Sequence, residues 1–223
     1  MPFLFDVISP YLYLSCTIPG FDYPRQNLPP QFHFIGPCFP PGGEISSVLD
    51  LPKDKPIVHV TQGTLSNDPQ DLIVPTIKAL TDEPVHLVVT LGDRKIEELG
   101  LTSLPSNVQV EPFIPHGQLL PLVDVMITNG GFNGVQTALS HGVPLICAGK
   151  TEEKPEVCAR VAWSGTGIDL KTQQPQPQQI KQAVRKVLAD QRYRQQAEMF
   201  QQSIASMDSA LNGAVLLERL AER

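Results

Sequence analysis

From about Lys55 onward, short apolar runs alternate with amphipathic stretches. The apolar runs are rich in β-branched residues and almost uninterrupted by polar ones, which is typical of strands buried on both faces of a parallel sheet. They are IVHVTQ (57–62), VHLVVTL (85–91), NVQVEPF (107–113), DVMITN (124–129) and VPLICAG (143–149). We therefore expect a parallel sheet with one strand at each of these positions.

The stretches between the apolar runs have the spacing of helices that cover a sheet. Leu72, Thr76 and Leu80 recur every four residues before the second run, and Val135 and Ala138 lie three apart before the fifth. Strands and helices in alternation predict an α/β fold with a Rossmann-like, doubly wound parallel sheet.

After residue 170 the chain is expected to become helical. Pro175 and Pro177 precede a stripe formed by Ile180, Val184 and Val187, and a second apolar stripe covers residues 193–204. Apolar residues at these intervals predict amphipathic helices. A last helix is expected over about 209–221, so the sheet is followed by extra C-terminal helices.

Residues 1–54 differ from the rest because prolines recur throughout them. Proline forbids long helices and favours extended backbone. We interpret residues 1–54 as a connector and residues 55–223 as one domain.

Charge and composition exclude several classes of protein. Lys and Arg number 17 against 23 Asp and Glu, a net charge of −6, and no long basic run is present. Binding to nucleic acid or to an anionic bilayer is therefore not expected. Mean hydropathy is −0.07 and no apolar stretch approaches the length of a transmembrane span. The four cysteines lack CxxC spacing, which favours reduced thiols and a cytoplasmic location.

Ligands bind beyond the carboxyl ends of the strands in such sheets, so the loops after the strands are candidate sites. After the fourth run, Asn129-Gly130-Gly131-Phe132-Asn133-Gly134 leads directly into a helix. Its glycines allow close approach, and a helix N-terminus offers unpaired N–H groups to an anion such as a diphosphate. A purely structural turn is the alternative reading.

The other loops give weaker signals. After the first run, Thr64 in TQGT (61–64) offers a hydroxyl to an anion, although a simple turn explains it equally. Phe113 could stack on a base or be an ordinary core aromatic, and His116 follows it. The charged run containing Glu153 and Lys154 could be a solvated face or the first turn of a helix.

Taken together and in order, these motifs resemble one family. TQGT (61–64), LLPLVDVMITNGG (119–131), GVPL (142–145), TEEK (151–154) and ARVAWSG (159–165) are similar to the C-terminal, donor-binding domain of GT-B glycosyltransferases of family 1. That group includes UDP-glucuronosyltransferases, UDP-glucosyltransferases and macrolide glycosyltransferases. The segment FDYPRQNLPPQFHFIGP (21–37) resembles the passage from the N-terminal domain into the donor domain.

The resemblance implies roles for individual residues. Thr64 and the loop formed by Asn129, Gly130, Gly131, Asn133 and Gly134 would contact the donor diphosphate. Phe113 would stack on uracil, with His116 near the base, and Glu153 with Lys154 would hold sugar hydroxyls. Asn129, Glu153 and Lys154 depart from the wider family, as does Thr137 at the ribose position. No DxD pair occurs, so we expect neither a metal nor a cofactor.

The expected function is that of the donor-binding half of an inverting glycosyltransferase. It would transfer a hexose from a UDP-sugar to a hydroxyl of a small lipophilic acceptor. No catalytic residue is assigned, because the family's catalytic base lies in the N-terminal domain. The expected partners are that N-terminal domain or a second copy of the chain. The alternative is a non-catalytic module that binds nucleotide sugar, or a truncated or split subunit that requires a partner domain.

Overall fold

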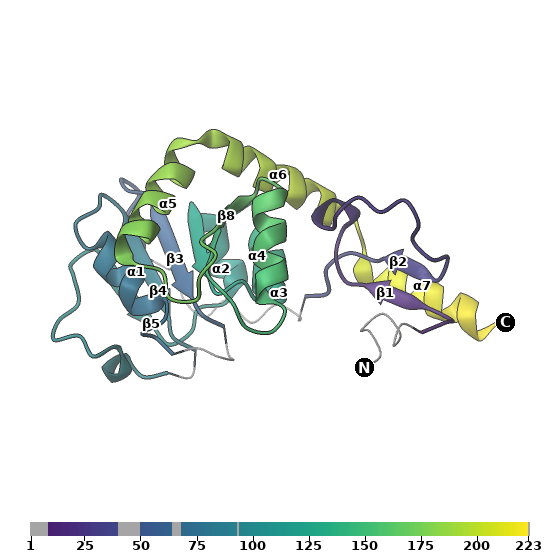
Figure 1. Cartoon of the computed structure of the whole chain (residues 1–223), viewed down its shortest axis with the longest axis horizontal. Helices are drawn as coiled ribbons and strands as arrows, with labels where there is room; N and C mark the ends of the chain where they lie inside the picture. The colour runs from purple at the N-terminus through teal and green to yellow at the C-terminus, as the bar shows by residue number, and fades with distance from the viewer. Residues whose placement is uncertain (1–8, 40–49, 64–67, 93, 223) are drawn as a thin grey trace.

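A parallel sheet of six strands forms the centre of the chain (Figure 1). The computed structural model describes residues 9–39, 50–63, 68–92 and 94–222. The sheet has the order β5-β4-β3-β6-β7-β8. Its strands are β3 (Ile57–Thr61), β4 (His86–Thr90), β5 (Val108–Glu111), β6 (Val125–Thr128), β7 (Leu145–Cys147) and β8 (Gly167–Asp169). The predicted doubly wound parallel sheet is confirmed.

The strand β8 is the one element of this sheet that the apolar pattern did not predict. It is a three-residue strand at the edge, and it begins with Gly167. A side chain at Gly167 would clash with the backbone of Leu145 in the neighbouring strand. The strand therefore depends on close backbone packing, which leaves little trace in a hydrophobic pattern.

The chain reverses its direction of travel across the sheet between β3 and β6. It runs outward from β3 to β4 and β5, and returns to place β6 beside β3, with Thr61 opposite Thr128. The helices that follow β3 and β6, α1 (Ile73–Leu80) and α3 (Phe132–Ser140), consequently lie on opposite faces. This reversal produces a crevice at the carboxyl edge, the usual ligand position in such sheets.

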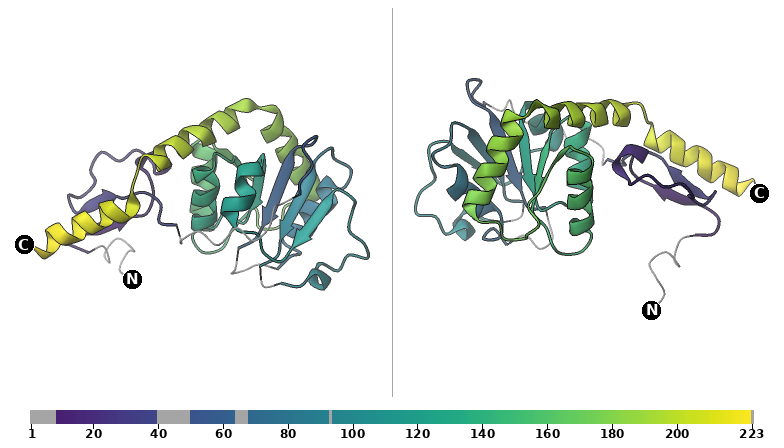
Figure 2. Two further views of the ribbon diagram at one scale, coloured as in Figure 1. Left: turned by 180° about the vertical axis from the view of Figure 1, so that it is seen from behind. Right: turned by 45° about the horizontal axis from the view of Figure 1, so that its top comes forward.

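Helices cover both faces of the sheet (Figures 1 and 2). The helices α1 (Ile73–Leu80) and α5 (Pro177–Ala189) pack on the face that carries Val58 and Val60. The other face, which carries Val88 and Met126, is covered by α2 (His116–Leu119), α3 (Phe132–Ser140), α4 (Lys154–Trp163) and α6 (Gln191–Ala205). Short 3-10 helices are also present, namely η2 (Pro19–Phe21), η3 (Ile96–Leu99) and η4 (Leu120–Leu122).

A small second unit lies apart from the main sheet (Figures 1 and 2). The strands β1 (Tyr13–Ser15) and β2 (Phe32–Phe34) form a parallel pair beside the last helix, α7 (Ser209–Ala221). Gly213 of α7 faces this pair, and a Cβ there would meet Ile35 Cδ1 at 3.7 Å, an ordinary van der Waals distance. Extended segments were expected in the proline-rich stretch, and the division at residues 54 and 55 stays a prediction.

No helix in the described part of the chain has both the length and the apolar character that crossing a bilayer requires.

Candidate donor-binding site

The two loops that follow β3 and β6 meet at the carboxyl edge of the sheet. The side-chain amide of Asn129, which is 7% exposed, donates a hydrogen bond to the carbonyl oxygen of Gln62. A Cβ on Gly63 would lie 3.7 Å from the same amide group. Asn129 therefore joins the TQGT loop to the glycine-rich loop.

The glycine-rich loop leads into α3, whose start has no side-chain cap. The Gly130 N–H donates to the Thr128 hydroxyl at 3.3 Å, and the Gly131 N–H donates to Asn129 Oδ1 at 3.4 Å. Gly131 is the N-cap residue of α3, and no side chain caps the helix. The first-turn N–H groups of a helix have no acceptor within it and carry its positive partial charge. The start of α3 can therefore accept an anionic group.

Close packing beneath the loop fixes its shape. Gly130 has φ +81°, and a Cβ there would collide with the sulfur of Cys158 in α4. The hydrogen bond with Cys158, together with burial, holds the pKa of the Cys147 thiol well above its usual value. Gly149 in turn packs against the carbonyl of Asn129 so closely that any side chain would clash. The loop thus rests on two buried thiols and one backbone contact.

Glu153 and Lys154, which the resemblance assigns to sugar hydroxyls, have different surroundings. Glu153 is exposed at the N-cap of α4. Lys154 is 5% exposed, and its ammonium forms an ion pair with Glu152 and lies 3.3 Å from the Thr151 hydroxyl. Burial lowers the pKa of Lys154. The reading of this run as a solvated face therefore fits Glu153 and fails for Lys154.

Phe113 and His116 lie on the loop after β5. Phe113 is 73% exposed, which excludes the core-aromatic reading. His116 begins α2, and its ring meets that of His59 edge to face at 5.8 Å. Burial, with a smaller contribution from the charge of His141, lowers the pKa of His116. His116 is therefore neutral at pH 7.

The other predicted positions have these surroundings. Thr64 lies outside the described residues. Asn133 is exposed on the first turn of α3, followed by Gly134. The hydroxyl of Thr137 donates to the Asn133 carbonyl at 2.7 Å. The hydroxyl proton of Thr137, the residue that the resemblance places at the ribose position, is therefore already used in a hydrogen bond within α3.

Gln62 is a structural member of the site that sequence reasoning missed. It is 3% exposed, its amide donates to the Asp68 carbonyl at 2.9 Å, and its Oε1 accepts from the Ile73 N–H at 3.2 Å. Gln62 thus connects the β3 loop to the start of α1 as well as to Asn129. Gln62 belongs to the TQGT motif, but the residues that it contacts, Asp68, Ile73 and Asn129, lie outside that motif.

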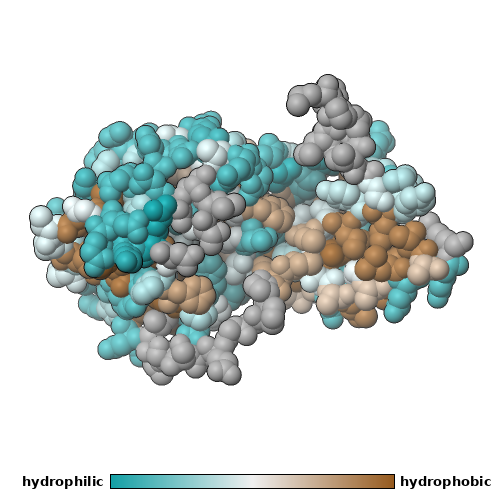
Figure 3. Space-filling view, turned by 90° about the horizontal axis from the view of Figure 1, so that it is seen from below, coloured by the Kyte–Doolittle hydropathy of each residue, from teal (hydrophilic) through white to brown (hydrophobic). Residues whose placement is uncertain are grey.

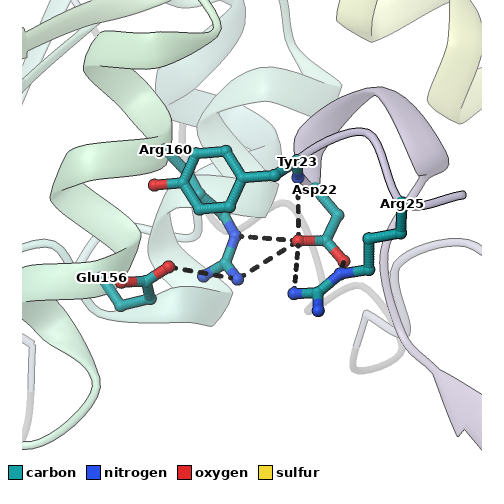
Figure 4. Close-up of polar contacts among 5 residues, drawn as sticks. All are labelled: Asp22, Tyr23, Arg25, Glu156 and Arg160. Carbon is teal, nitrogen blue, oxygen red and sulfur yellow. Dashed lines mark hydrogen bonds and ion pairs between the residues drawn. The ribbon is translucent and has the colours of Figure 1, made fainter.

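A second missed group joins the N-terminal segment to α4 (Figure 4). Arg160 Nη2 lies 3.2 Å from Asp22 Oδ1 and 3.4 Å from Glu156, and the Arg160 guanidinium stacks 5.2 Å from the centre of the Tyr23 ring. Arg25 Nε donates to the other oxygen of Asp22 at 2.9 Å. We call the four charged residues Asp22, Arg25, Glu156 and Arg160 the latch.

Comparison with known proteins identifies the family. Residues 75–216 match the model of the erythromycin biosynthesis protein CIII-like C-terminal domain. The chain belongs to this family. The resemblance to the C-terminal domain of GT-B glycosyltransferases is thereby confirmed.

The chain is similar in sequence to named enzymes and in fold to solved structures. It is 45% identical to 4'-demethylrebeccamycin synthase of Lentzea aerocolonigenes, over 95% of the chain and 50% of that protein. It is 40% identical to UDP-glycosyltransferase 2 of Phaeomoniella chlamydospora, over 96% of the chain and 50% of that protein. The calicheamicin glycosyltransferase CalG4 superposes with a TM-score of 0.76 at 26% identity, over 95% of the chain and 53% of CalG4.

The kitacinnamycin glycosyltransferase, at 22% identity and a TM-score of 0.81, shares the fold over 95% of the chain and 55% of its own length. The CIII-like chain spans about half the length of these proteins.

Proposed function

We propose that the chain is the donor-binding half of an inverting glycosyltransferase that uses a UDP-sugar. The single observation that supports this most is the uncapped start of α3 at the crevice, with Gly130 and Gly131 before it. In this proposal the diphosphate lies against the backbone N–H groups of residues 131–134. Thr64, Phe113 and His116 would contact the rest of the nucleotide, and Glu153 and Lys154 the sugar.

The proposed chemistry is transfer to a hydroxyl of a small lipophilic acceptor. The acceptor oxygen attacks the anomeric carbon while the bond from that carbon to the UDP oxygen breaks, and the hydroxyl proton passes to a base on the other half of the enzyme. Negative charge grows on the departing diphosphate. The positive end of α3 would stabilise that charge without a metal.

Within the part of the chain that the structure describes, no three His, Cys, Asp or Glu side chains gather as metal ligands. The absence of a metal or cofactor stays a prediction, as does the cytoplasmic location.

The proposed site is tested by calorimetric titration of the folded chain with UDP, TDP and UDP-glucose. We expect saturable binding of UDP that weakens about tenfold or more in Gly131→Val, because the valine would occupy the anion position at the helix start. Gly131 suits this test, since a Cβ there meets nothing closer than Asn129 Oδ1 at 3.7 Å and the fold should survive.

The matched control is Gly20→Val, where an added Cβ meets only Phe200, at 4.0 Å. It should bind UDP like the unaltered chain. Equal binding by Gly131→Val, or no UDP binding by a chain that circular dichroism shows to be folded, would refute the proposed site. Donor binding without transfer in the presence of the other half would favour the non-catalytic alternative.

A further inference from the structure

Two cysteines meet where the strands of the β1–β2 unit end. Cys16 directly follows β1, and Cys38 lies shortly after β2. Their sulfurs are 3.5 Å apart, although the two residues are separated by 22 positions in the sequence. Both thiols are free and both side chains are exposed. A disulfide holds its sulfurs at about 2 Å, so closure requires an approach of about 1.5 Å.

The backbone around the two cysteines is fixed by hydrogen bonds that continue the pairing of β1 with β2. The Ile35 N–H donates to the Ser15 carbonyl at 3.0 Å, and the Gly36 N–H donates to the Thr17 carbonyl at 3.2 Å. Gly36 has φ +93°, a value that favours glycine, and the ring of Pro37 restricts the next φ. The two thiols are therefore held close together before any bond joins them.

Access to reagents distinguishes this pair from the other two cysteines. Cys147 and Cys158 are fully buried beneath the glycine-rich loop. Cys16, by contrast, lines a hollow of about 890 Å³, which gives a small reagent room to approach its sulfur. This hollow lies beside β1 and β2, and Figure 3 shows hydrophobic surface gathered on the side of the molecule that carries them. A reagent in solution should therefore reach the pair at the surface and not the buried pair.

We propose that Cys16 and Cys38 form a redox-active dithiol, which closes to a disulfide by exchange with a small-molecule disulfide such as oxidised glutathione. The proposal is independent of the proposed function. It agrees with the expectation of reduced thiols, because disulfides in a reducing compartment are mostly transient or redox-sensing. Exposed disulfides are also the ones that are readily reduced again.

The exchange takes two steps. Partial burial and the adjacent Cys38 sulfur raise the pKa of Cys16, so the Cys38 thiolate makes the first attack. A bond forms between Cys38 Sγ and one sulfur of the reagent, the reagent's own sulfur–sulfur bond breaks, and its first half leaves as a thiol. Cys16 Sγ then attacks Cys38 Sγ and releases the second half. The two cysteines lose two protons and two electrons, and the reagent gains them as two thiols.

Closure would stabilise the β1–β2 unit. A two-stranded sheet is marginal on its own, and a bond between positions 16 and 38 restricts the unfolded chain. Thr17, next to Cys16, donates from its hydroxyl to Gln136 Oε1 of α3 at 3.2 Å, so the cross-linked segment is also tied to the main sheet's helices. We expect slower amide hydrogen exchange in β1 and β2 of the oxidised chain and unchanged exchange in β3 and β6.

The test incubates the full chain in mixtures of reduced and oxidised glutathione, with a chelator present and air excluded. Free thiols are trapped with a maleimide, and the peptides are mapped by mass spectrometry. We expect an internal disulfide between Cys16 and Cys38, with the loss of two hydrogens, while Cys147 and Cys158 stay reduced. Excess reduced glutathione should restore both exposed thiols.

Single variants separate the two steps of the exchange. Cys16→Ser and Cys38→Ser alter exposed side chains and should fold. Each should accumulate a mixed disulfide with glutathione, because no second thiol is present to displace it. The control is the double variant Cys16→Ser with Cys38→Ser, whose hydrogen exchange should be the same with and without oxidised glutathione.

Several results would overturn the proposal. They are a lasting mixed disulfide on the unaltered chain, disulfides between chains, and a bond between Cys147 and Cys158 in place of the one between Cys16 and Cys38. Hydrogen exchange in β1 and β2 that is unchanged in the oxidised chain would overturn it as well.

Discussion

Gly130 is the residue on which the shape of the glycine-rich loop most depends. Its φ of +81° is unfavourable for any residue with a side chain, and a Cβ would meet the sulfur of Cys158. We predict that Gly130→Ala lowers the free energy of unfolding by about 2–4 kcal/mol, from backbone strain and overpacking together. Urea denaturation measures this loss.

The double variant Gly130→Ala with Cys158→Ala separates the two causes. Removing the sulfur relieves the collision and leaves the backbone strain, so the double variant should lose less than the sum of the single losses. Strictly additive losses would contradict the contact.

His59 makes stability depend on pH. It is fully buried in β3, with Nε2 3.0 Å from the Thr90 hydroxyl, and burial, aided by the charge of His116, lowers its pKa to about 3. The unfolded chain binds a proton near pH 6.5 and the folded chain does not. The stabilisation is therefore complete above pH 6.5 and is lost as the pH falls from 6.5 toward 3.

His59→Gln retains a hydrogen-bonding group toward Thr90 and does not titrate. We predict that unfolding free energy in the unaltered chain falls by up to roughly 1.4 kcal/mol per pH unit below 6.5 through this one group. That portion of the slope should be missing in His59→Gln. Denaturation curves at pH 7.5, 6 and 5 compare the two, and parallel pH profiles would contradict the assignment.

At the scale of elements, α7 owes its start to one side chain. Asp208 is its N-cap, and the carboxylate accepts from the Leu211 N–H at 2.9 Å. Asp208→Ala should cost about 1 kcal/mol, while Asp208→Asn keeps an acceptor and should cost little. Because α7 covers β1 and β2, faster amide hydrogen exchange in all three elements is the expected readout. Exchange confined to α7 would show that the sheet pair is held by other contacts.

Elements with a long apolar pattern were predictable from sequence, and those defined by backbone contacts were not. The five apolar runs became β3 to β7, and the helix expected over about 209–221 is α7 at Ser209–Ala221. The strand β8 escaped notice because Ile168 is its only strongly apolar residue. The pairing of β1 with β2 also could not be read, because the strands of three residues each lie among prolines.

Within the site, the glycine-rich loop could be predicted and its supports could not. Gly130 and Gly131 directly precede α3 and Gly134 lies in its first turn, so this signal is visible in neighbouring positions of the sequence. The contact between Asn129 and Gln62 joins residues 67 positions apart. Lys154 is buried while the neighbouring Glu153 is exposed, and the Lys154 ammonium pairs with Glu152; the charged run alone does not show which of its residues is buried.

At the scale of the whole molecule, the latch ties the β1–β2 unit to the main sheet. Burial acts to raise the pKa of Asp22, but hydrogen bonds from Arg25 and the Tyr23 N–H, with the charges of Arg25 and Arg160, outweigh it and lower the pKa. The carboxylate therefore stabilises the folded chain above pH 3.8, and that contribution is lost as the pH falls below it.

Asp22→Asn should release the β1–β2 unit while leaving the main sheet intact. We expect faster amide hydrogen exchange in β1, β2 and α7 and unchanged exchange in β3 and β6. A double-mutant cycle with Arg160→Met should give a coupling of about 1 kcal/mol for this partly exposed pair. Global acceleration of exchange, or no coupling, would contradict the role of the latch.

We propose that the start of α3 binds the donor diphosphate. Amide chemical-shift mapping of the isotope-labelled chain during titration with UDP tests it most directly. We expect the largest shifts at the N–H groups of residues 131–134, with smaller shifts at Gly63 and near Phe113. Saturable binding whose shifts gather elsewhere, such as around Tyr13 of β1 and Phe32 of β2, would contradict this proposal.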